Sequence, residues 1–313
     1  MSKIALAADF HLDSRRTNLL GDKVDPETGL SRYSIMRLNA FEEYLQLLNK
    51  SKCNKLVIIG DLFNSTVDER IKDRVFALIR KHLKKCWIII GNHEYSRYYH
   101  TYSSLKNFEM SKTKLTIIDE PTLVDLGHHS VFMIPWQSDT KIPDEATSVF
   151  MHADPDEVKM KKGFYYVFGH IHDFIHGDKF LQLGPQFPTS YGEEANGRLC
   201  FLTDSGYEFE PCPMLFDIVE VESQEDIENN DPSRVCYRVN AGMEGLKFPQ
   251  KSIRYIHFDS SAEKEEMDVG DTSSARKTLK KDMKKWMKQE KVPKKLRKLV
   301  KKRVLKTVKD VRR

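Results

Sequence analysis

Side chains that can bind metals follow apolar runs at five places in this sequence. Each run has the length and composition of a buried strand, and the polar residues come directly after it. A single Asp or His in such a place is usually a helix cap or a hydrogen-bonded core residue. Five strand ends that offer such side chains towards one edge of a sheet indicate a functional site, because α/β folds place their sites there. The candidates are Asp9 and His11 in "LAADFHLD", Asp61 in "LVIIGDLF", Asn92 and His93 in "WIIIGNHE", His152 in "SVFMHAD", and His170 and His172 in "YYVFGHIHD".

The residue types in this set fit a site for two divalent cations. Such a pair needs a bridging carboxylate, further oxygen and imidazole ligands, and positions left open for water and a phosphate group. No cysteine is among the candidates, so the set favours manganese, iron or zinc over metals that prefer sulfur. In an extended segment, the D-x-H and H-x-H spacings place both side chains on the same side of the chain.

The elements that must position these residues are short strands with helices between the early ones. Two stretches place apolar residues on one helix face, at Ile35, Leu38, Leu45 and Leu48 and at Val75, Leu78, Ile79 and Leu83. Hydrophobic, often β-branched runs predict strands at Ile4–Ala8, Leu56–Ile59, Trp87–Ile90, Leu115–Ile118, Ser130–Ile134, Ser148–Met151, Phe164–Phe168 and Lys179–Leu183. The expected fold class is therefore α/β, with a two-sheet β-sandwich core flanked by helices.

The pattern of hydrophobic and polar residues changes after about residue 205, and we predict four segments along the chain. Residues 1–205 form the core, and residues 206–260 contain three alternating stretches that predict a small, mostly β domain. Residues 261–274 are polar and have the composition of a linker. Residues 275–313 carry apolar stripes at helical spacing on both sides of "KVPKK", which predicts a basic helix-loop-helix.

Charge is distributed unevenly along the chain. Residues 275–313 hold 19 Lys and Arg against 3 acidic residues, whereas the preceding 274 residues hold 32 basic and 43 acidic side chains. An acidic body with a basic tail predicts a tail that binds a partner surface or nucleic acid. The longest apolar runs are too short to span a bilayer, and the N-terminus has no signal-peptide pattern, so we expect a cytoplasmic protein without membrane contact.

The motifs D-x-H, G-D, G-N-H-[DE], H and G-H-x-H occur here in that order, as "DFH", "GD", "GNHE", "MHAD" and "GHIH". On these motifs the chain resembles the calcineurin-like metallophosphoesterases. Within that superfamily it looks like the SbcD-type nuclease subunits of double-strand-break repair complexes, including their phage recombination-endonuclease forms. "GDLF", the loop "LQLGPQFPTSYGEE", the small cap, the linker and the helix-loop-helix carry this closer resemblance.

The resemblance implies a role for each candidate. One metal is held by Asp9, His11, Asp61 and His172, and a second by Asp61, Asn92, His152 and His170, with Asp61 as the bridge. His93 is the implied catalytic residue, which stabilises the transition state or protonates the leaving 3′ oxygen, although a role in orienting a ligand stays open. Glu94 is expected to support the site rather than bind a metal. SbcD-type nucleases often have a His where this chain has Asn64, so the support that this position gives to the catalytic His is in doubt.

The resemblance also implies a function and partners. The expected activity is manganese-dependent exonuclease and endonuclease cleavage of DNA during repair and recombination. Residues 206–260 are expected to form a capping domain that contacts DNA, residues 275–313 to bind an SMC-like ATPase, and the nuclease domain to form a homodimer. A phosphatase or phosphodiesterase acting on a substrate other than DNA is the alternative enzyme, and a catalytically inactive scaffold that binds DNA and a partner is a further one.

Overall fold

The computed structural model describes one compact unit of the chain, Met1–His257. The linker at 261–274 and the helix-loop-helix at 275–313 therefore lie outside the described residues. The described part runs from residue 3 to residue 257, with gaps at 13–18, 65–67, 95–104, 106–113, 137, 139, 190–192, 194, 241–242, 244 and 251.

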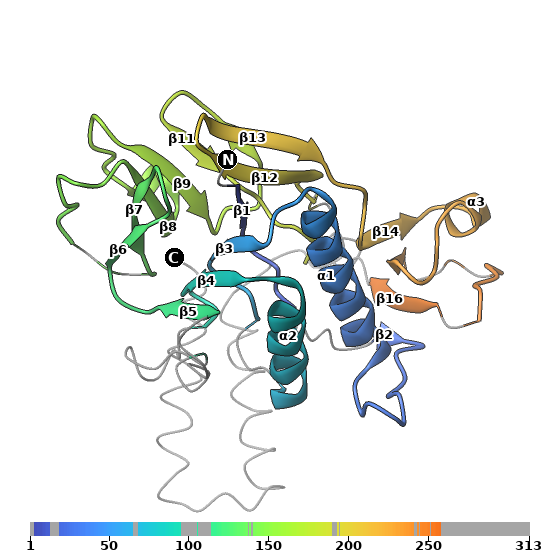
Figure 1. Cartoon of the computed structure of the whole chain (residues 1–313). Coiled ribbons are helices and arrows are strands. Elements are labelled where there is room, and N and C mark those ends of the chain that lie inside the picture. Colours follow the sequence, from blue (N-terminus) through green and yellow to red (C-terminus); the bar gives the residue numbers. More distant parts are fainter. Residues whose placement is uncertain are drawn as a thin grey trace, which may run out of the picture. The chain divides into compact units, whose positions relative to one another are not determined.

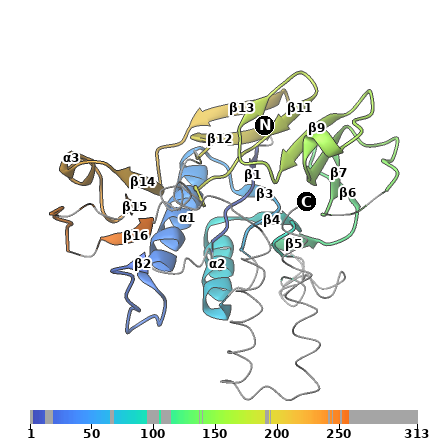
Figure 2. The same ribbon diagram turned by 180° about the vertical axis from the view of Figure 1, so that it is seen from behind.

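Two six-stranded sheets form the core (Figures 1 and 2). In the order β13-β12-β1-β3-β4-β5, the first sheet contains β1 (Ile4–Ala7), β3 (Lys55–Ile59), β4 (Lys85–Ile89), β5 (Leu115–Ile118), β12 (Arg198–Thr203) and β13 (Gly206–Pro211). In the order β10-β11-β9-β8-β7-β6, the second contains β6 (Thr122–Asp125), β7 (Ser130–Ile134), β8 (Ser148–His152), β9 (Tyr165–Gly169), β10 (Ile175–His176) and β11 (Phe180–Gln182). The consecutive strands β1, β3, β4 and β5 of the first sheet are parallel, and so are β11, β9, β8 and β7 of the second.

Alternation along the strands divides the core into layers. Leu56 and Ile58 of β3 pack against the helices α1 (Arg32–Lys50) and α2 (Glu69–His82), which lie side by side on the first sheet. Val57 and Ile59, on the opposite face of the same strand, belong to the core between the two sheets. Such burial on both faces is expected for parallel strands covered on each side.

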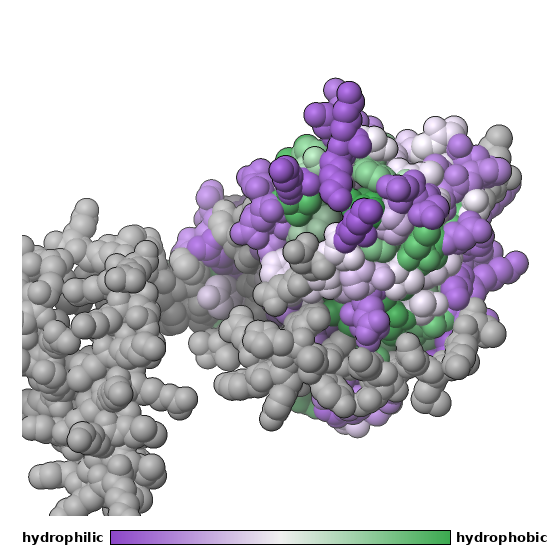
Figure 3. All heavy atoms as spheres, turned by 90° about the vertical axis from the view of Figure 1, so that its left-hand side faces the viewer, coloured by the Kyte–Doolittle hydropathy of each residue, from purple (hydrophilic) through white to green (hydrophobic). Residues whose placement is uncertain are grey.

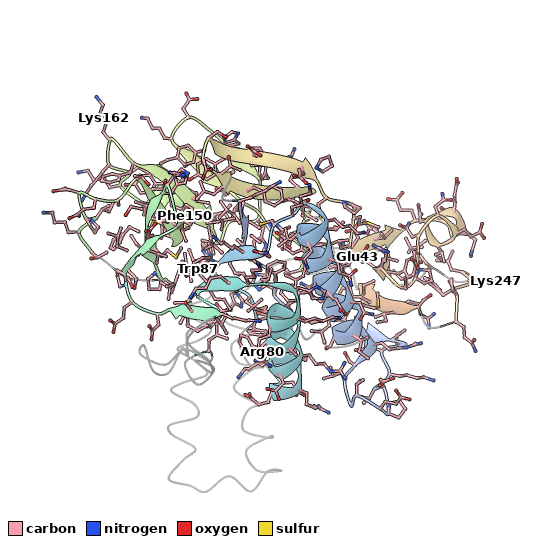
Figure 4. The ribbon with its side chains drawn as sticks, viewed as in Figure 1. Glu43, Arg80, Trp87, Phe150, Lys162 and Lys247 are labelled. Carbon is pink, nitrogen blue, oxygen red and sulfur yellow. The ribbon has the colours of Figure 1, made fainter. Side chains whose placement is uncertain are left out.

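The core between the sheets is formed by large apolar side chains from both. Trp87 of β4 and Phe150 of β8 are buried in the same cluster (Figure 4). The outer face of the second sheet is covered mainly by irregular segments that place Ile142, Ala146 and Val158 against it. Figure 3 views the protein from this side, where hydrophilic side chains surround small hydrophobic patches on the described surface.

A third, four-stranded sheet has the order β14-β15-β16-β2. It contains β14 (Asp217–Val221), β15 (Val235–Asn240) and β16 (Ile253–His257), with α3 (Gln224–Glu228) following β14, and its last strand is β2 (Leu19–Leu20) from the N-terminal segment. The boundary predicted at residue 206 was wrong, because β13 pairs with β12 in the first sheet. Arg234 donates a hydrogen bond of 3.0 Å to Glu43, which points from α1 towards the small sheet (Figure 4).

The predicted two-sheet α/β core is confirmed, and its geometry brings the five motif-bearing strand ends together. The backbone bridge between Ala8 and Pro185 joins the end of β1 to the segment after β11, and Trp136 donates its backbone N–H to Ile90 beyond β4. The carboxyl ends of β1, β3 and β4 therefore face those of β8 and β9. None of the described helices has the length and apolar character needed to cross a membrane.

Candidate metal centre

Backbone hydrogen bonds hold the segments after β1 and β3 side by side. Asp9 donates its backbone N–H to Gly60 at 3.2 Å, and His11 donates its own to Asp61 at 2.9 Å. This extends the parallel pairing past the regular strands. As a result, the side chains of the first two motifs are placed at one edge of the first sheet.

Four candidate ligands adopt left-handed backbone conformations. The φ angles are 54° at Asp9, 44° at His11, 49° at Asp61 and 95° at His170, and the only other non-glycine residue of this kind in the described chain is Lys52. Each such conformation costs on the order of 1–3 kcal/mol, so it persists only where the surrounding structure enforces it. The strain is therefore concentrated where the polar side chains converge.

The structure brings all eight predicted site residues together. Asp9, His11 and His172 offer ligand atoms within 4.8 Å of one another, and so do Asp61, His152 and His170. His11, Asp61 and His93 form a third group, which overlaps both of the others. The first two groups contain every His and Asp that the resemblance assigned to one metal or the other, and the third group joins them through His11 and Asp61.

Asp61 has the position required of a bridging carboxylate. Its Oδ1 accepts a hydrogen bond of 3.0 Å from the backbone N–H of His93, which fixes the rotation of the carboxylate. Its Oδ2 lies 3.3 Å from Nε2 of His152 and 3.7 Å from Nε2 of His11. One oxygen atom thus faces a residue from each group.

Asn92 and His152 show that the cluster fits a cation. Nδ1 of His152 lies 3.0 Å from the carbonyl oxygen of Ile59 and donates its hydrogen there, which leaves a lone pair on Nε2 of the neutral ring. That Nε2 lies 2.8 Å from Oδ1 of Asn92, which is also an acceptor. Two acceptors this close need a proton or a metal ion between them, and Oδ2 of Asp61 points to the same place.

Three more buried polar side chains also fit a site that binds cations. The His11 side chain is buried, and neither of its ring nitrogens has a hydrogen-bond partner among the described residues. Asp9 and Asp61 are buried as well, and within the part of the chain that the structure describes their ion-pair partners are histidines rather than Lys or Arg. Buried carboxylates of this kind are normally paired or bound to a metal.

Burial and neighbouring charges shift the pKa values of these groups. Burial raises the pKa of Asp9 to about 7 and lowers the pKa of His11 to about 3. Burial alone would lower the pKa of His152, but the charge of Asp61 and its hydrogen bond raise it to about 9. Binding of a cation would displace the protons that Asp9 and His152 carry.

His93 is positioned by Asn64, which removes the doubt raised by the sequence. Nδ1 of His93 lies 2.5 Å from Oδ1 of Asn64, so a hydrogen on Nδ1 is donated to the amide oxygen. The opposite nitrogen, Nε2, faces the cluster at 3.8 Å from Oδ2 of Asp61. About a third of the His93 side chain is exposed, in contrast to the buried His11 and His152, so this ring can reach a substrate.

Glu94 supports the site. Its buried carboxylate accepts three backbone hydrogen bonds, from Asp61 at 3.1 Å, Phe63 at 2.9 Å and Gly91 at 2.9 Å. Burial raises the pKa of Glu94 to about 8, and the amides of Phe63 and Gly91 oppose this shift. A single side chain therefore joins the loops after β3 and β4, which carry Asp61, Asn92 and His93.

Glycines precede three of the ligand positions because the backbones and side chains lie very close together. A Cβ at Gly60, which has a φ of +80°, would collide with the His152 imidazole. A Cβ at Gly91 would collide with the carboxylate and the backbone nitrogen of Asp61. The Gly-Asp and Gly-Asn pairs in the sequence are thus a packing requirement of the site.

Two supporting residues around the histidines were missed by the sequence reasoning. Oε1 of Glu193 lies 3.3 Å from Nδ1 of His172, while its Oε2 accepts two bonds of 2.7 Å from Thr189. The indole of Trp136 packs on the His170 ring with centroids 4.7 Å apart. Trp136 follows a strand in "VFMIPWQS", as the ligands do, so its place at a strand end was the available signal.

Arg37 is a third residue that was missed, and it acts on the first motif. Its guanidinium is fully buried and donates to the carbonyl oxygen of Phe10 at 2.6 Å and to that of Pro188 at 2.9 Å. Phe10 lies between the left-handed residues Asp9 and His11. Arg37 therefore supports the strained turn of "DFH" through the carbonyl group between its two left-handed residues. Nothing in the sequence around Arg37 signals this contact.

The comparisons with known proteins identify the family of this chain. The model of the calcineurin-like phosphoesterase family matches residues 2–174, more than half of the chain, and the chain belongs to that family. Its members are metal-dependent phosphoester hydrolases, and the His and Asp groups described above are able to bind metals. A search of curated proteins found no match.

Several solved structures are similar over most of their length. TT1561 of Thermus thermophilus has a TM-score of 0.41 at 10% identity, covering 67% of this chain and 98% of the other. A dimetal phosphatase from Danio rerio has a TM-score of 0.35 at 11% identity, with the same two coverages. The Pseudomonas putida nuclease MPE has a TM-score of 0.30 at 16% identity, covering 62% of this chain and 82% of the other.

The three hydrogen bonds to Glu94 predict a position that tolerates only a carboxylate. In Glu94→Gln the amide NH₂ would face backbone N–H groups, and we expect a loss of about 1–3 kcal/mol in the free energy of unfolding and about 10–100-fold weaker metal binding. Urea denaturation and metal titration measure the two effects. Glu94→Asp keeps a carboxyl group that can accept from these amides and should retain more of both properties, whereas an equal loss in the two variants would contradict this role.

Proposed function

We propose that this chain is a dinuclear metal-dependent nuclease that hydrolyses phosphodiester bonds in DNA. The observation that carries the proposal is the Asp61 carboxylate, which faces both groups of candidate ligands while His93 lies beside it and is exposed. Two cations bridged by a carboxylate, with a proton donor next to them, suit cleavage of a phosphoester with an alkoxide leaving group.

Each residue of the proposed active site has a distinct role. Asp9, His11, Asp61 and His172 would hold one cation, and Asp61, Asn92, His152 and His170 the other. When bound, the cations supply an activated water molecule and neutralise charge on the phosphoryl group. Nε2 of the protonated His93 donates a hydrogen to the leaving 3′ oxygen, while Asn64 accepts the hydrogen on Nδ1 and keeps the ring facing the site. The oxygen and imidazole ligands suit manganese, iron or zinc, and of these manganese is the metal we propose.

DNA is favoured over other phosphoesters by two features of the sequence. The segment "GDLFNSTVDE" after β3 lacks the arginine with which protein Ser/Thr phosphatases grip a phosphorylated residue. Residues 275–313 carry a density of Lys and Arg that suits contact with nucleic acid or with a DNA-bound partner. A role in double-strand-break repair and recombination is part of the same proposal.

The alternative is a phosphatase or phosphodiesterase for another substrate, since "GNHE" is the spelling typical of protein phosphatases. Glu94 is the residue that gives this spelling, and its carboxylate is occupied by three backbone amides. A side chain buried in this way does not contact a substrate. The difference between Glu and Asp at this position therefore says little about substrate class.

The first test measures substrate class directly. We expect the purified full chain with Mn²⁺ to cleave labelled duplex and single-stranded DNA, with little turnover of a nitrophenyl phosphomonoester. Asp61→Ala should lower DNA cleavage by at least about 10³-fold and reduce the bound metal, because it removes the bridging ligand. Turnover of the monoester by a chain that does not cut DNA would reject the nuclease proposal.

A second prediction concerns the role of His93. If His93 protonates the leaving oxygen, His93→Ala should slow DNA cleavage by about 10²–10⁴-fold. Hydrolysis of a nitrophenyl phosphodiester should fall much less, because nitrophenolate leaves without a proton. His128→Ala, at a surface position, is the matched control. Equal losses on the two substrates would instead assign His93 a role in binding or in orienting a ligand.

We further propose that residues 275–313 bind an SMC-like ATPase. The sequence predicts apolar stripes on two basic helices there, and such stripes would need a partner surface, whereas a solvated tail would not need them. Deletion of 275–313 should abolish co-purification with the ATPase and spare Mn²⁺-dependent cleavage of short DNA. Complex formation that is unchanged by the deletion would disprove this. Homodimer formation through the nuclease domain stays a prediction.

A further inference from the structure

The two proposed cation sites share only Asp61. The Asp9 site consists of Asp9, His11, Asp61 and His172, and the Asn92 site consists of Asp61, Asn92, His152 and His170. The Asn92 site is supported by Glu94, which joins the loops after β3 and β4, and by the carbonyl oxygen of Ile59, which orients His152. The first segment of the Asp9 site is held by a different buried side chain, that of Arg37 in α1.

The guanidinium of Arg37 is fixed by the aromatic rings around it. It lies 5.9 Å from the ring centroid of Tyr33, 5.7 Å from that of Phe187 and 5.0 Å from that of Phe216. Burial of a cation is costly unless its donors are bonded, and rings in contact with a guanidinium limit its orientation. The acceptors of Arg37 are therefore held at defined positions.

The hydrogen bonds of Arg37 join two segments that are distant in the sequence. One terminal nitrogen donates to the carbonyl oxygen of Phe10 at 2.6 Å, and the other donates to that of Pro188 at 2.9 Å. Phe10 follows β1, whereas Pro188 follows β11. The planar fork of a guanidinium holds two acceptors at a fixed separation, which the single ammonium group of a lysine does not.

The bond to Phe10 acts on two ligands of the Asp9 site. Phe10 stands between Asp9 and His11, whose φ angles are 54° and 44°. Strained backbone of this kind persists only where contacts enforce it. The carbonyl group of Phe10 is part of both peptide segments that must keep their turn, so the bond from Arg37 positions both ligands.

The bond to Pro188 reaches a third ligand. Thr189 comes directly after Pro188, and its backbone N–H and its hydroxyl both donate to Oε2 of Glu193 at 2.7 Å. Oε1 of Glu193 lies 3.3 Å from Nδ1 of His172. A carboxylate that accepts the hydrogen on Nδ1 sets the direction of the ring and leaves Nε2 for a cation.

We infer that Arg37 is a positioning residue for the Asp9 site, so that binding of a cation there depends on Arg37 and binding at the Asn92 site does not. Through its two carbonyl acceptors, one buried side chain sets the positions of Asp9, His11 and His172. The inference rests on the two cation sites of the proposed function. It concerns the binding of metal and not the choice of substrate.

Variants with one complete site separate the two cations. Asn92→Ala removes a ligand of the Asn92 site alone, and His172→Ala removes a ligand of the Asp9 site alone. The full chain is freed of metal and titrated with Mn²⁺ in a calorimeter, without DNA. In the Asn92→Ala chain we expect Arg37→Lys to weaken Mn²⁺ binding about 10–100-fold, because an ammonium group cannot hold both carbonyls. In the His172→Ala chain the same change should alter the affinity little.

Two further variants control for stability. Leu48 is buried in the same core, near the other end of α1, so Leu48→Ala destabilises this helix without touching either ligand segment. It should leave the Mn²⁺ affinity of the Asn92→Ala chain unchanged, with folding checked by urea denaturation. The Glu193 side chain is about 20% exposed, so we expect Glu193→Gln to fold and to weaken Mn²⁺ binding in the Asn92→Ala chain alone.

Equal losses in the two single-site chains would overturn the inference, because they would mean a general loss of structure. Unchanged affinity of the Asn92→Ala chain would also overturn it, whether the second change is Arg37→Lys or, where that variant does not fold, Glu193→Gln. Both outcomes leave the nuclease proposal standing, since that proposal is tested by DNA cleavage. An unmodified chain that binds a single Mn²⁺ would reject the pair of sites and the inference with it.

Discussion

The structure depends on one electrostatic constraint, which is the convergence of buried carboxylates and imidazoles without Lys or Arg partners in the described chain. Asp9 and Asp61 repel one another, and Nε2 of His152 meets a second acceptor at 2.8 Å. Their arrangement persists because bonds outside the cluster fix each of them, such as the backbone N–H of His93 on Asp61 and the carbonyl of Ile59 on His152. Bound cations would then find the ligands already in place.

The backbone carries much of the cost of this arrangement. Left-handed conformations at Asp9, His11, Asp61 and His170 turn successive side chains of the loops towards one point. The supporting contacts act at these turns: Arg37 caps the carbonyl between Asp9 and His11, and the Asp9 carboxylate accepts the backbone N–H of His170 at 3.1 Å. The strained backbone positions are therefore the ones that these hydrogen bonds support, as expected where a site must be rigid before its ligand binds.

The strands, and the meeting of the candidate ligands at one edge of the sheets, could be predicted from the sequence because both depend on local pattern. Apolar runs of four or five residues mark strands buried on both faces, and polar residues at their ends mark the edge of a parallel sheet. Contacts between distant segments left no such pattern. Alternation identified Gly206–Pro211 as a strand but not its partner β12, and nothing near Leu19–Leu20 predicted its pairing with β16. The same holds for Glu193 and Arg37, which reach the ligands from other segments.

Asn64 illustrates how a departure from a family pattern can keep the physical function. Where a histidine stands at this position, either ring of the pair can carry the shared hydrogen. An amide oxygen can only accept, so the 2.5 Å contact assigns the hydrogen to Nδ1 of His93. If His93 protonates a leaving oxygen, as proposed, the proton must then come from Nε2, the nitrogen 3.8 Å from Asp61. Asn64 therefore fixes both the direction of the His93 ring and the nitrogen that carries the shared hydrogen.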